Sequence, residues 1–321
     1  MIVNEWDAVF TAKYGHQFPQ SYLTFDTEFT GSNGRDDLIL EIGHTMVEDG
    51  KVVDEMNIVL NWYDHPQVQE SWLNYKLNNM RHIVGPSWTL MPDMVRKEGI
   101  DPVKALRFYH KLFDTWKQRG LPFVAQNGQT ADERLLRGNF DKFLNKPFEL
   151  PANGYFDTGA IYKATQIWNA TDGDAMNFKL NMLPHRTDTL KTYFNRVIHT
   201  RVSGVKWSLD LILDHYDLIE KHNVTPEQRH SAGFDSLCLY WIMEEFHSRV
   251  SKVNVEENPF ASAEAMQRAF DQESAKYKLA QEAKAKATTE EAPREAPATG
   301  QVKRTKAAPS QKRRRRKQRV I

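Results

Sequence analysis

Residues 21–32, SYLTFDTEFTGS, decide how the rest of the chain is interpreted. Tyr22 and Phe25 give this stretch the apolar and aromatic character of a buried strand, and a glycine-containing turn follows it. The strand also carries two acids, Asp26 and Glu28. Because side chains two positions apart on a strand point to the same face, we expect both carboxylates to project together from a rigid support.

Two carboxylates held this close repel each other unless a cation lies between them. Their oxygens are the ligands that Mg²⁺ and Mn²⁺ prefer, so Asp26 and Glu28 predict half of a divalent-metal site. An isolated Asp-x-Glu pair also occurs at a strand end where both acids face water. The acids that follow along the chain must decide between these interpretations.

The composition, 321 residues with 40% hydrophobic and 26% charged, predicts a soluble globular protein with one large domain or two small ones. We expect no leader and no membrane contact, because no apolar run approaches the length of a membrane span. The single cysteine, Cys238, excludes an internal disulfide and a cysteine-rich zinc site. It favours a reducing compartment, and we expect a cytoplasmic protein.

Charge is distributed unevenly along the chain. The overall net charge is +1, but residues 288–321 contain eleven Lys or Arg and three Glu, a net charge of +8. The remainder of the chain therefore carries −7. A basic segment on an acidic body predicts a polyanionic partner, and we expect this tail to contact nucleic acid.

The strand pattern predicts one sheet. Two β-rich runs, 38–47 and 51–60, flank a short glycine turn and form a hairpin beside the first strand. Further short strands are expected at 122–127 and from Tyr155. A helix begins at Asp101-Pro102, a capping residue followed by proline. Residues 61–100 remain unassigned, with Trp62, Trp72 and Trp88 interpreted as packing anchors in preference to base-stacking platforms.

A third acid follows the strand at 122–127. Thr130 and Glu133 have the spacing of a capping box, which places Asp132 in the first turn of a helix. Ligands of open α/β sheets bind at this position, just beyond a strand end. An acid in a first turn also complements the helix dipole, so Asp132 alone decides nothing.

Residues 169–206 form a polar stretch on an acidic body, and either a phosphate-contacting flap or a solvated loop explains it. After it, Ser208 is expected to cap a helix through Leu218. The basic and histidine side chains of the polar stretch are Lys179, His185, Arg186, Lys191, Arg196, His199, Arg201 and Lys206.

The segment 229–235, RHSAGFD, leads into an apolar helix and brings the last acid, Asp235, five residues after His230. A lone histidine before a helix is usually structural. Here it accompanies the fourth acid of the series.

Together these residues resemble the three motifs of the DEDD exonuclease superfamily. The histidine spacing resembles the DEDDh branch, which includes DnaQ-like, RNase T and oligoribonuclease types, and the resemblance covers roughly residues 20–248. Ala131 and Gln126 depart from the aromatic residue and the histidine that this family often has at the second motif. The matching positions are Asp26-x-Glu28, Asn127 with Asp132, and His230-x₄-Asp235.

The resemblance implies an α/β ribonuclease H-like fold, a five-stranded mixed sheet whose first three strands are antiparallel, with helices on both faces. It also implies that Asp26, Glu28, Asp132 and Asp235 bind two Mg²⁺ or Mn²⁺ ions and that His230 is the general base. The implied reaction releases nucleoside 5′-monophosphates from the 3′ end of a single strand. We expect nucleic acid to contact Thr27, Phe29, Asn127, Arg186 and Lys191.

The predicted domains are a lead-in (1–20), an exonuclease domain (21–248), a helical extension (249–287) and a disordered basic tail (288–321). Within the tail, KRRRRKQR (312–319) predicts a nucleic-acid arm or, less favoured, a nuclear localisation signal. Three functions remain open: an exodeoxyribonuclease, which we favour, an exoribonuclease, and a non-catalytic nucleic-acid-binding module. No residue pattern identifies a polymerase or other replication partner.

Overall fold

The computed structural model describes residues 18–85, 87–169, 184–185, 187–225 and 228–250, together with nine helical residues between 268 and 283. The chain divides into two compact units, Met1–Tyr277 and Lys278–Ile321. Most of the predicted lead-in and helical extension, and all of the basic tail, lie outside the described residues. No helix in the described parts of the chain is long and apolar enough to cross a membrane.

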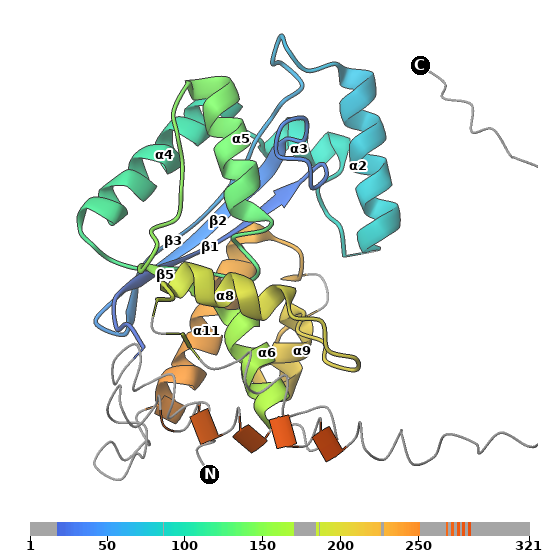
Figure 1. Ribbon diagram of the computed structural model, residues 1–321. Helices are drawn as coiled ribbons and strands as arrows, with labels where there is room; N and C mark the ends of the chain where they lie inside the picture. The colour runs from blue at the N-terminus through green and yellow to red at the C-terminus, as the bar shows by residue number, and fades with distance from the viewer. Residues whose placement is uncertain are drawn as a thin grey trace, which may run out of the picture. The chain divides into compact units, whose positions relative to one another are not determined.

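The first unit contains a five-stranded mixed sheet with the strand order β3-β2-β1-β4-β5 (Figure 1). The first three strands are antiparallel, whereas β4 and β5 run parallel to β1. This confirms the predicted α/β class and the five-stranded mixed sheet with its first three strands antiparallel. The strands are β1 (Tyr22–Phe29), β2 (Ile39–Glu48), β3 (Lys51–Val59), β4 (Phe123–Ala125) and β5 (Tyr155–Asp157).

Strand β1 occupies the centre because its sequence can be buried on both faces. Leu23 and Phe25 lie on one face of the sheet, and Tyr22 and Thr24 lie on the other. All four side chains are buried. A strand apolar on both faces requires helices above and below it. The sheet therefore holds the end of β1, with its two acids, in a fixed position.

Helices cover both faces of the sheet, α4 and α5 on one side and α6 and α11 on the other (Figure 1). Two of the helices, α2 and α3, lie in the segment 61–100 that the sequence left unassigned. The described helices of the first unit are α2 (Glu70–Val84), α3 (Pro92–Glu98), α4 (Pro102–Gln118), α5 (Asp132–Leu144), α6 (Thr158–Asn169), α8 (Leu190–His199), α9 (Leu209–His215), α10 (Leu218–Lys221) and α11 (Ala232–Val250).

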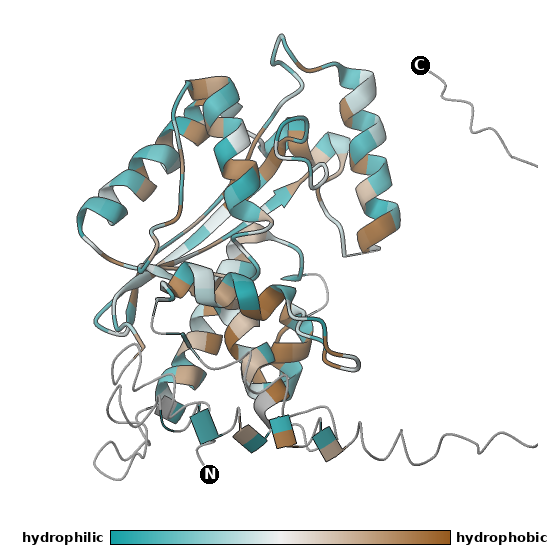
Figure 2. Ribbon diagram, viewed as in Figure 1, coloured by the Kyte–Doolittle hydropathy of each residue, from teal (hydrophilic) through white to brown (hydrophobic). Residues whose placement is uncertain are grey.

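Helix α4 begins where the sequence predicts, with the Asp101 carboxylate accepting a hydrogen bond from the Lys104 N–H at 2.9 Å. Its apolar stripe packs on the sheet, and Figure 2 shows the alternation of hydrophobic and hydrophilic residues along it. The Tyr109 hydroxyl donates to the Ile42 carbonyl oxygen at 2.7 Å, so the helix is also fixed to β2 by a buried hydrogen bond. Trp62 and Trp88 are buried, which confirms their interpretation as packing anchors.

The predicted capping box at α5 is not formed, so that prediction was wrong. The helix begins after Ala131, and the Thr130 hydroxyl donates to the Asn127 backbone and side-chain oxygens instead. Glu133 accepts hydrogen bonds from the Leu150 N–H and the Lys191 ammonium. The spacing matches the motif, but the Thr130 hydroxyl is used within its own turn and the Glu133 carboxylate is used by more distant residues.

The polar stretch 169–206 is partly packed into the core. It contains α8, whose apolar face buries Tyr193, Phe194 and Val197, and a capping box at Thr189 begins the helix. The described part is therefore not a solvated loop, whereas residues 170–183 and 186 lie outside the described residues. The helix expected from Ser208 to Leu218 ends at His215, because Asp217 adopts a left-handed conformation before α10.

Helix α11 crosses β1 and β2 at very short range. The Thr24 hydroxyl donates to the Ser236 carbonyl oxygen at 2.7 Å, within the first turns of the helix. At Gly43 of β2, an added Cβ would lie 2.1 Å from the Gly233 nitrogen. Only a glycine at this position lets the start of α11 reach the sheet.

We expect Gly43→Ala to destabilise the protein by about 1–3 kcal/mol or more, because the methyl group would overlap the backbone of α11 and the core would have to shift. The measurement is the urea midpoint of unfolding, with Gly120→Ala as the control, since an added Cβ there meets no atom within 4 Å. The control carries only the backbone penalty of a positive φ, about 1–2 kcal/mol. Gly43→Ala should also lose divalent-cation binding, whereas Gly120→Ala should keep it. If the two variants had the same urea midpoint and the same cation binding, the close packing of α11 on Gly43 would not explain the effect.

Candidate active site

Four acids from three separate segments converge on one cavity of about 270 Å³. Asp26 and Glu28 extend from β1, Asp132 is the first residue of α5, and Asp235 lies in the first turn of α11. His230 lies immediately before α11 and lines the same cavity. The structure thus brings together all five residues to which the sequence assigns catalysis and metal binding.

Burial and mutual repulsion act together on these acids. Burial raises the pKa of Asp26 well above its ordinary value, and the charges of Asp132, Asp235 and Glu28 raise it further. The pKa of Glu28 is raised in the same way, first by burial and then by Asp235 and Glu41. A cluster of this kind is unfavourable when ionised unless positive charge is added to it.

The pKa values of Asp132 and Asp235 are each raised to about 7, mainly by burial. A 2.5 Å hydrogen bond from the Thr27 hydroxyl to Asp132 partly opposes the shift, and Arg229 partly opposes it at Asp235. Both carboxyls therefore change charge near neutral pH.

The carboxylates fit a divalent-cation site. Among the described residues, none donates a hydrogen bond to the carboxylates of Asp26 or Glu28, and no Lys or Arg forms an ion pair with any of the four acids. Buried carboxylates are ordinarily paired or coordinate metal. Their oxygen donors are of the kind that hard divalent cations such as Mg²⁺ and Mn²⁺ prefer.

His230 lies close enough to the acids to share in cation binding. One ligand atom each from Glu28, His230 and Asp235 lie within 4.8 Å of one another. The backbone of His230 is left-handed, with φ of 59°, which is uncommon for a residue with a side chain. Strained conformations of this kind persist only where the surroundings impose them, and they concentrate at functional sites.

Glu41 and Asn57 impose that geometry on the start of α11. Glu41 accepts hydrogen bonds from the Ala232 N–H at 3.1 Å and the Ser231 hydroxyl at 3.3 Å, and it also binds the Asn57 amide. The Asn57 oxygen accepts from the Gly233 N–H at 2.9 Å. A buried acid on β2, next to the first helical N–H groups, both caps α11 and fixes the turn at His230.

Glu41 was not predicted from the sequence, although an acid in the middle of a predicted apolar strand is a usable signal. Asp210, at the start of α9, and Arg229 were not predicted either; they line the cavity and form an ion pair at 3.3 Å. The Arg229 Nε is buried and has no hydrogen-bond partner within the described part of the chain. Arg229 therefore keeps donor capacity beside the carboxylates.

The residues predicted to bind nucleic acid are placed differently from one another. Thr27 and Phe29 line the cavity. The Asn127 N–H donates to Asp157 at 3.1 Å, and its side chain accepts from Thr130, so this residue holds the β4–α5 turn. The Lys191 ammonium pairs with Glu133 at 2.6 Å and Glu149 at 3.2 Å and is not among the residues lining the cavity. Arg186 lies outside the described residues.

No protein-family model and no curated protein matches the sequence. Solved structures of exonuclease I are similar to this chain over part of their length. E. coli exonuclease I with a dA16 oligonucleotide has 13% identity and a TM-score of 0.44, covering 73% of this chain and 42% of that chain. The enzyme with a dT13 oligonucleotide has 13% identity and a TM-score of 0.42, covering 79% and 43%. Exonuclease I of Methylocaldum szegediense has 13% identity and a TM-score of 0.36, covering 63% and 46%.

The chain therefore spans less than half the length of these solved structures. Identities and TM-scores at this level do not establish a family or a function.

We expect the free energy of unfolding of the metal-free protein to fall as the pH rises from about 4 to about 7. The folded-state pKa of Asp132 and Asp235 is raised from 3.8 to about 7, so folding favours their protonated forms and this stabilisation is lost on ionisation. Mg²⁺ or Mn²⁺ should reverse the loss, because a cation binds the ionised carboxylates. Thermal denaturation with and without Mg²⁺ should show a larger increase in Tm at about pH 8 than at about pH 5.

Asp132→Asn should reduce this pH-dependent increase in Tm, because one of the four charges is removed. The matched control is Asp36→Asn, an exposed acid that does not line the cavity. The same increase in Tm at both pH values in the unaltered protein would argue against a cation site at these carboxylates.

Proposed function

We propose that this protein is a divalent-metal-dependent 3′–5′ exonuclease that releases nucleoside 5′-monophosphates from the 3′ end of single-stranded DNA. The observation that carries the proposal is the convergence of Asp26, Glu28, Asp132 and Asp235 on one cavity with His230 beside them. The order and spacing of these residues, which resemble the DEDDh motifs, supply the reaction type and its polarity.

The four carboxylates would hold two Mg²⁺ or Mn²⁺ ions. When bound, such a pair neutralises the scissile phosphate and stabilises the attacking and leaving oxygens. The fold fixes the positions of the carboxylates. Strand β1 lies in the centre of the sheet, and the Thr27 hydroxyl orients Asp132. Glu41 holds the first residues of α11, the helix that carries Asp235. Arg229 lines the cavity, and a guanidinium at this place suits a phosphate oxygen.

His230 would accept the proton of the attacking water. The carboxylates would be committed to the cations, so a separate base is needed, and histidine is the side chain that most often takes this role. His230 immediately precedes α11 and has a left-handed backbone. Glu41 and Asn57 fix this turn by accepting hydrogen bonds from the Ala232 and Gly233 N–H groups.

The dimensions of the cavity favour the end of a single strand. At about 270 Å³ it lies at the small end of ligand pockets, which measure about 300–1,000 Å³, and suits one terminal nucleotide. Phe29 and Leu209 give the rim apolar surface against which a base can pack. The choice of DNA over RNA is part of the proposal, with an exoribonuclease as the alternative outcome of the test.

The test is digestion of end-labelled single-stranded DNA and RNA of matched sequence, with Mg²⁺ and with Mn²⁺. We expect mononucleotides from the 3′ end of DNA, resistance of circular strands, and no reaction in EDTA. Asp26→Asn should abolish turnover while leaving the unfolding transition in place, because the amide keeps the shape of the carboxylate without its charge. Full activity in excess EDTA would refute the metal assignment, and cleavage of circles would indicate an endonuclease.

We expect His230→Ala to lower kcat by about 10²–10⁴-fold, the usual contribution of a positioned acid–base group. His82→Ala, an exposed histidine at the end of α2, is the matched control and should leave kcat unchanged. The Mg²⁺ concentration for half-maximal activity should stay the same in His230→Ala if the histidine acts as a base. A large increase in that concentration would instead make His230 a cation ligand together with Glu28 and Asp235.

A further inference from the structure

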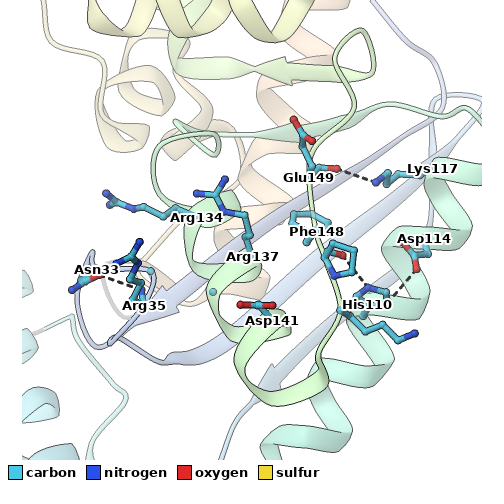
Figure 3. A pocket seen from close by; sticks show the side chains of 14 residues that line it. Asn33, Arg35, His110, Asp114, Lys117, Arg134, Arg137, Asp141, Phe148 and Glu149 are labelled. Carbon is cyan, nitrogen blue, oxygen red and sulfur yellow. Dashed lines mark hydrogen bonds and ion pairs between the residues drawn. The ribbon is translucent and has the colours of Figure 1, made fainter.

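A second cavity, of about 1110 Å³, lies beside α5 and is lined by none of the four acids of the first cavity. It is bounded by the loop between β1 and β2, the exposed side of α5, the segment 146–149 and the C-terminal half of α4. Figure 3 shows Arg134 and Arg137 extending from α5, with Arg35 coming from the loop. We refer to it as the α5 groove.

The α5 groove is basic on a body that is otherwise acidic. Five Lys or Arg line it against three acids, while residues 1–287 carry a net charge of −7. Two of the three acids already have partners: Asp114 pairs with His110 at 3.2 Å, and Glu149 pairs with Lys191 at 3.2 Å. Asp141 is the remaining one.

Four of the cations are available to a ligand. Among the described residues, no acid forms an ion pair with Arg35, Arg134, Arg137 or Lys146, and all four side chains are exposed. Arg134 and Arg137 are three positions apart on a helix, so their side chains leave the same side at an interval of about 5–6 Å. That arrangement forms a row of cations, which suits successive phosphates of one strand better than a single small anion.

The support beneath these cations is rigid. Gly34 of the loop lies directly against α5, since a Cβ at Gly138 would come within 1.6 Å of the Gly34 carbonyl oxygen. Asp37 fixes the same loop by accepting hydrogen bonds from the Asn33 N–H at 2.8 Å and from Lys76 at 2.6 Å. The backbone positions that carry Arg35 and the arginines of α5 are therefore fixed relative to one another before any ligand arrives, so binding orders only the side chains.

The groove and the acidic cavity are bordered by the same two segments. Phe29 and Ala131 line the acidic cavity, whereas Asn33 and Arg134 line the α5 groove. Along α5 the rise from Ala131 to Arg134 is only about 4.5 Å. A strand whose end lies at the carboxylates can thus continue along the arginines.

We propose that the α5 groove binds the phosphodiester backbone of single-stranded nucleic acid several nucleotides away from the end held at the carboxylates. This proposal rests on the proposed function for its substrate, and it adds a binding site that increases affinity for long strands. Arginine suits this role because its planar guanidinium donates two hydrogen bonds to one phosphate. The volume, above the range of about 300–1,000 Å³ for small-molecule pockets, suits an extended polymer.

The test compares the full-length protein with Arg134→Gln/Arg137→Gln. Both side chains are exposed and glutamine is a good helix former, so the fold should be retained. The control, Lys51→Gln/Arg81→Gln, removes the same charge from exposed residues outside the groove. Binding of fluorescent oligodeoxythymidylates is measured in EDTA across a range of salt concentrations, so that no hydrolysis occurs.

For a strand of about 15 nucleotides, within reach of single-strand site sizes of about 4–16, we expect the groove variant to bind roughly tenfold more weakly at low salt. Its plot of log affinity against log salt should lose about 1.4 from its slope, 0.7 for each phosphate contact removed. A trinucleotide should bind all three proteins equally. In Mg²⁺, KM for the long strand should rise in the groove variant and kcat should not change.

Unchanged affinity and salt slope in the groove variant would overturn the proposal, even if the protein hydrolyses DNA. Weaker binding that is the same in the groove variant and the control would also overturn it, because it would reflect overall charge. Groove-dependent binding without hydrolysis in Mg²⁺ or Mn²⁺ would support the groove and refute the exonuclease.

Discussion

Repulsion between buried carboxylates is the constraint on which the rest of this structure depends. Strand β1 places Asp26 and Glu28 where burial alone raises both pKa values, and α5 and α11 then add Asp132 and Asp235. No described lysine or arginine forms an ion pair with these four acids. The repulsion among these charges lowers the stability of the fold, but it creates a site that a doubly charged cation can occupy. Burial of the large apolar core of the first unit offsets this loss of stability.

The packing of α11 against the sheet fixes the position of the fourth acid relative to the acids of β1. Gly43 lies opposite Asp26 in the ladder and Glu41 lies opposite Glu28, so the same two positions of β2 face the acids of β1 and the start of α11. Because Gly43 has no side chain, α11 can approach the sheet, and the Glu41 carboxylate caps the start of the helix. The geometry of the site therefore depends on a strand that contributes no residue to its four carboxylates.

The sequence predicted those features that local patterns encode. Alternation and turn residues located β1 and the hairpin, and Asp101-Pro102 located the start of α4. The four acids and His230 were predicted from the spacing of residues within each motif. Each motif lies on one strand end or one helix start, so its spacing is visible in the sequence. Helices α2 and α3 were not found, because Trp, Asn and Met obscure the apolar period there, and their stability comes from tertiary packing. Thr130 and Glu133 had the spacing of a capping box, yet Thr130 donates to Asn127, three residues earlier, and Glu133 accepts from the distant residues Leu150 and Lys191.

Glu41 and the α5 groove escaped detection for a different reason. Each depends on residues that only the folded chain brings together: Glu41 with Ala232, and Arg35 with Arg134 and Arg137. No window of sequence contains such a pair.

The order of these segments along the chain has a consequence for synthesis. The first carboxylates of the cavity appear at Asp26 and the last at Asp235, on a helix that must pack across β1 and β2 before the acids meet. A ribosome that has made only the hairpin, α4 and α5 holds a chain with an incomplete cavity. The four carboxylates therefore cannot meet in one cavity until α11 has emerged and docked. The order of the elements along the chain sets this delay.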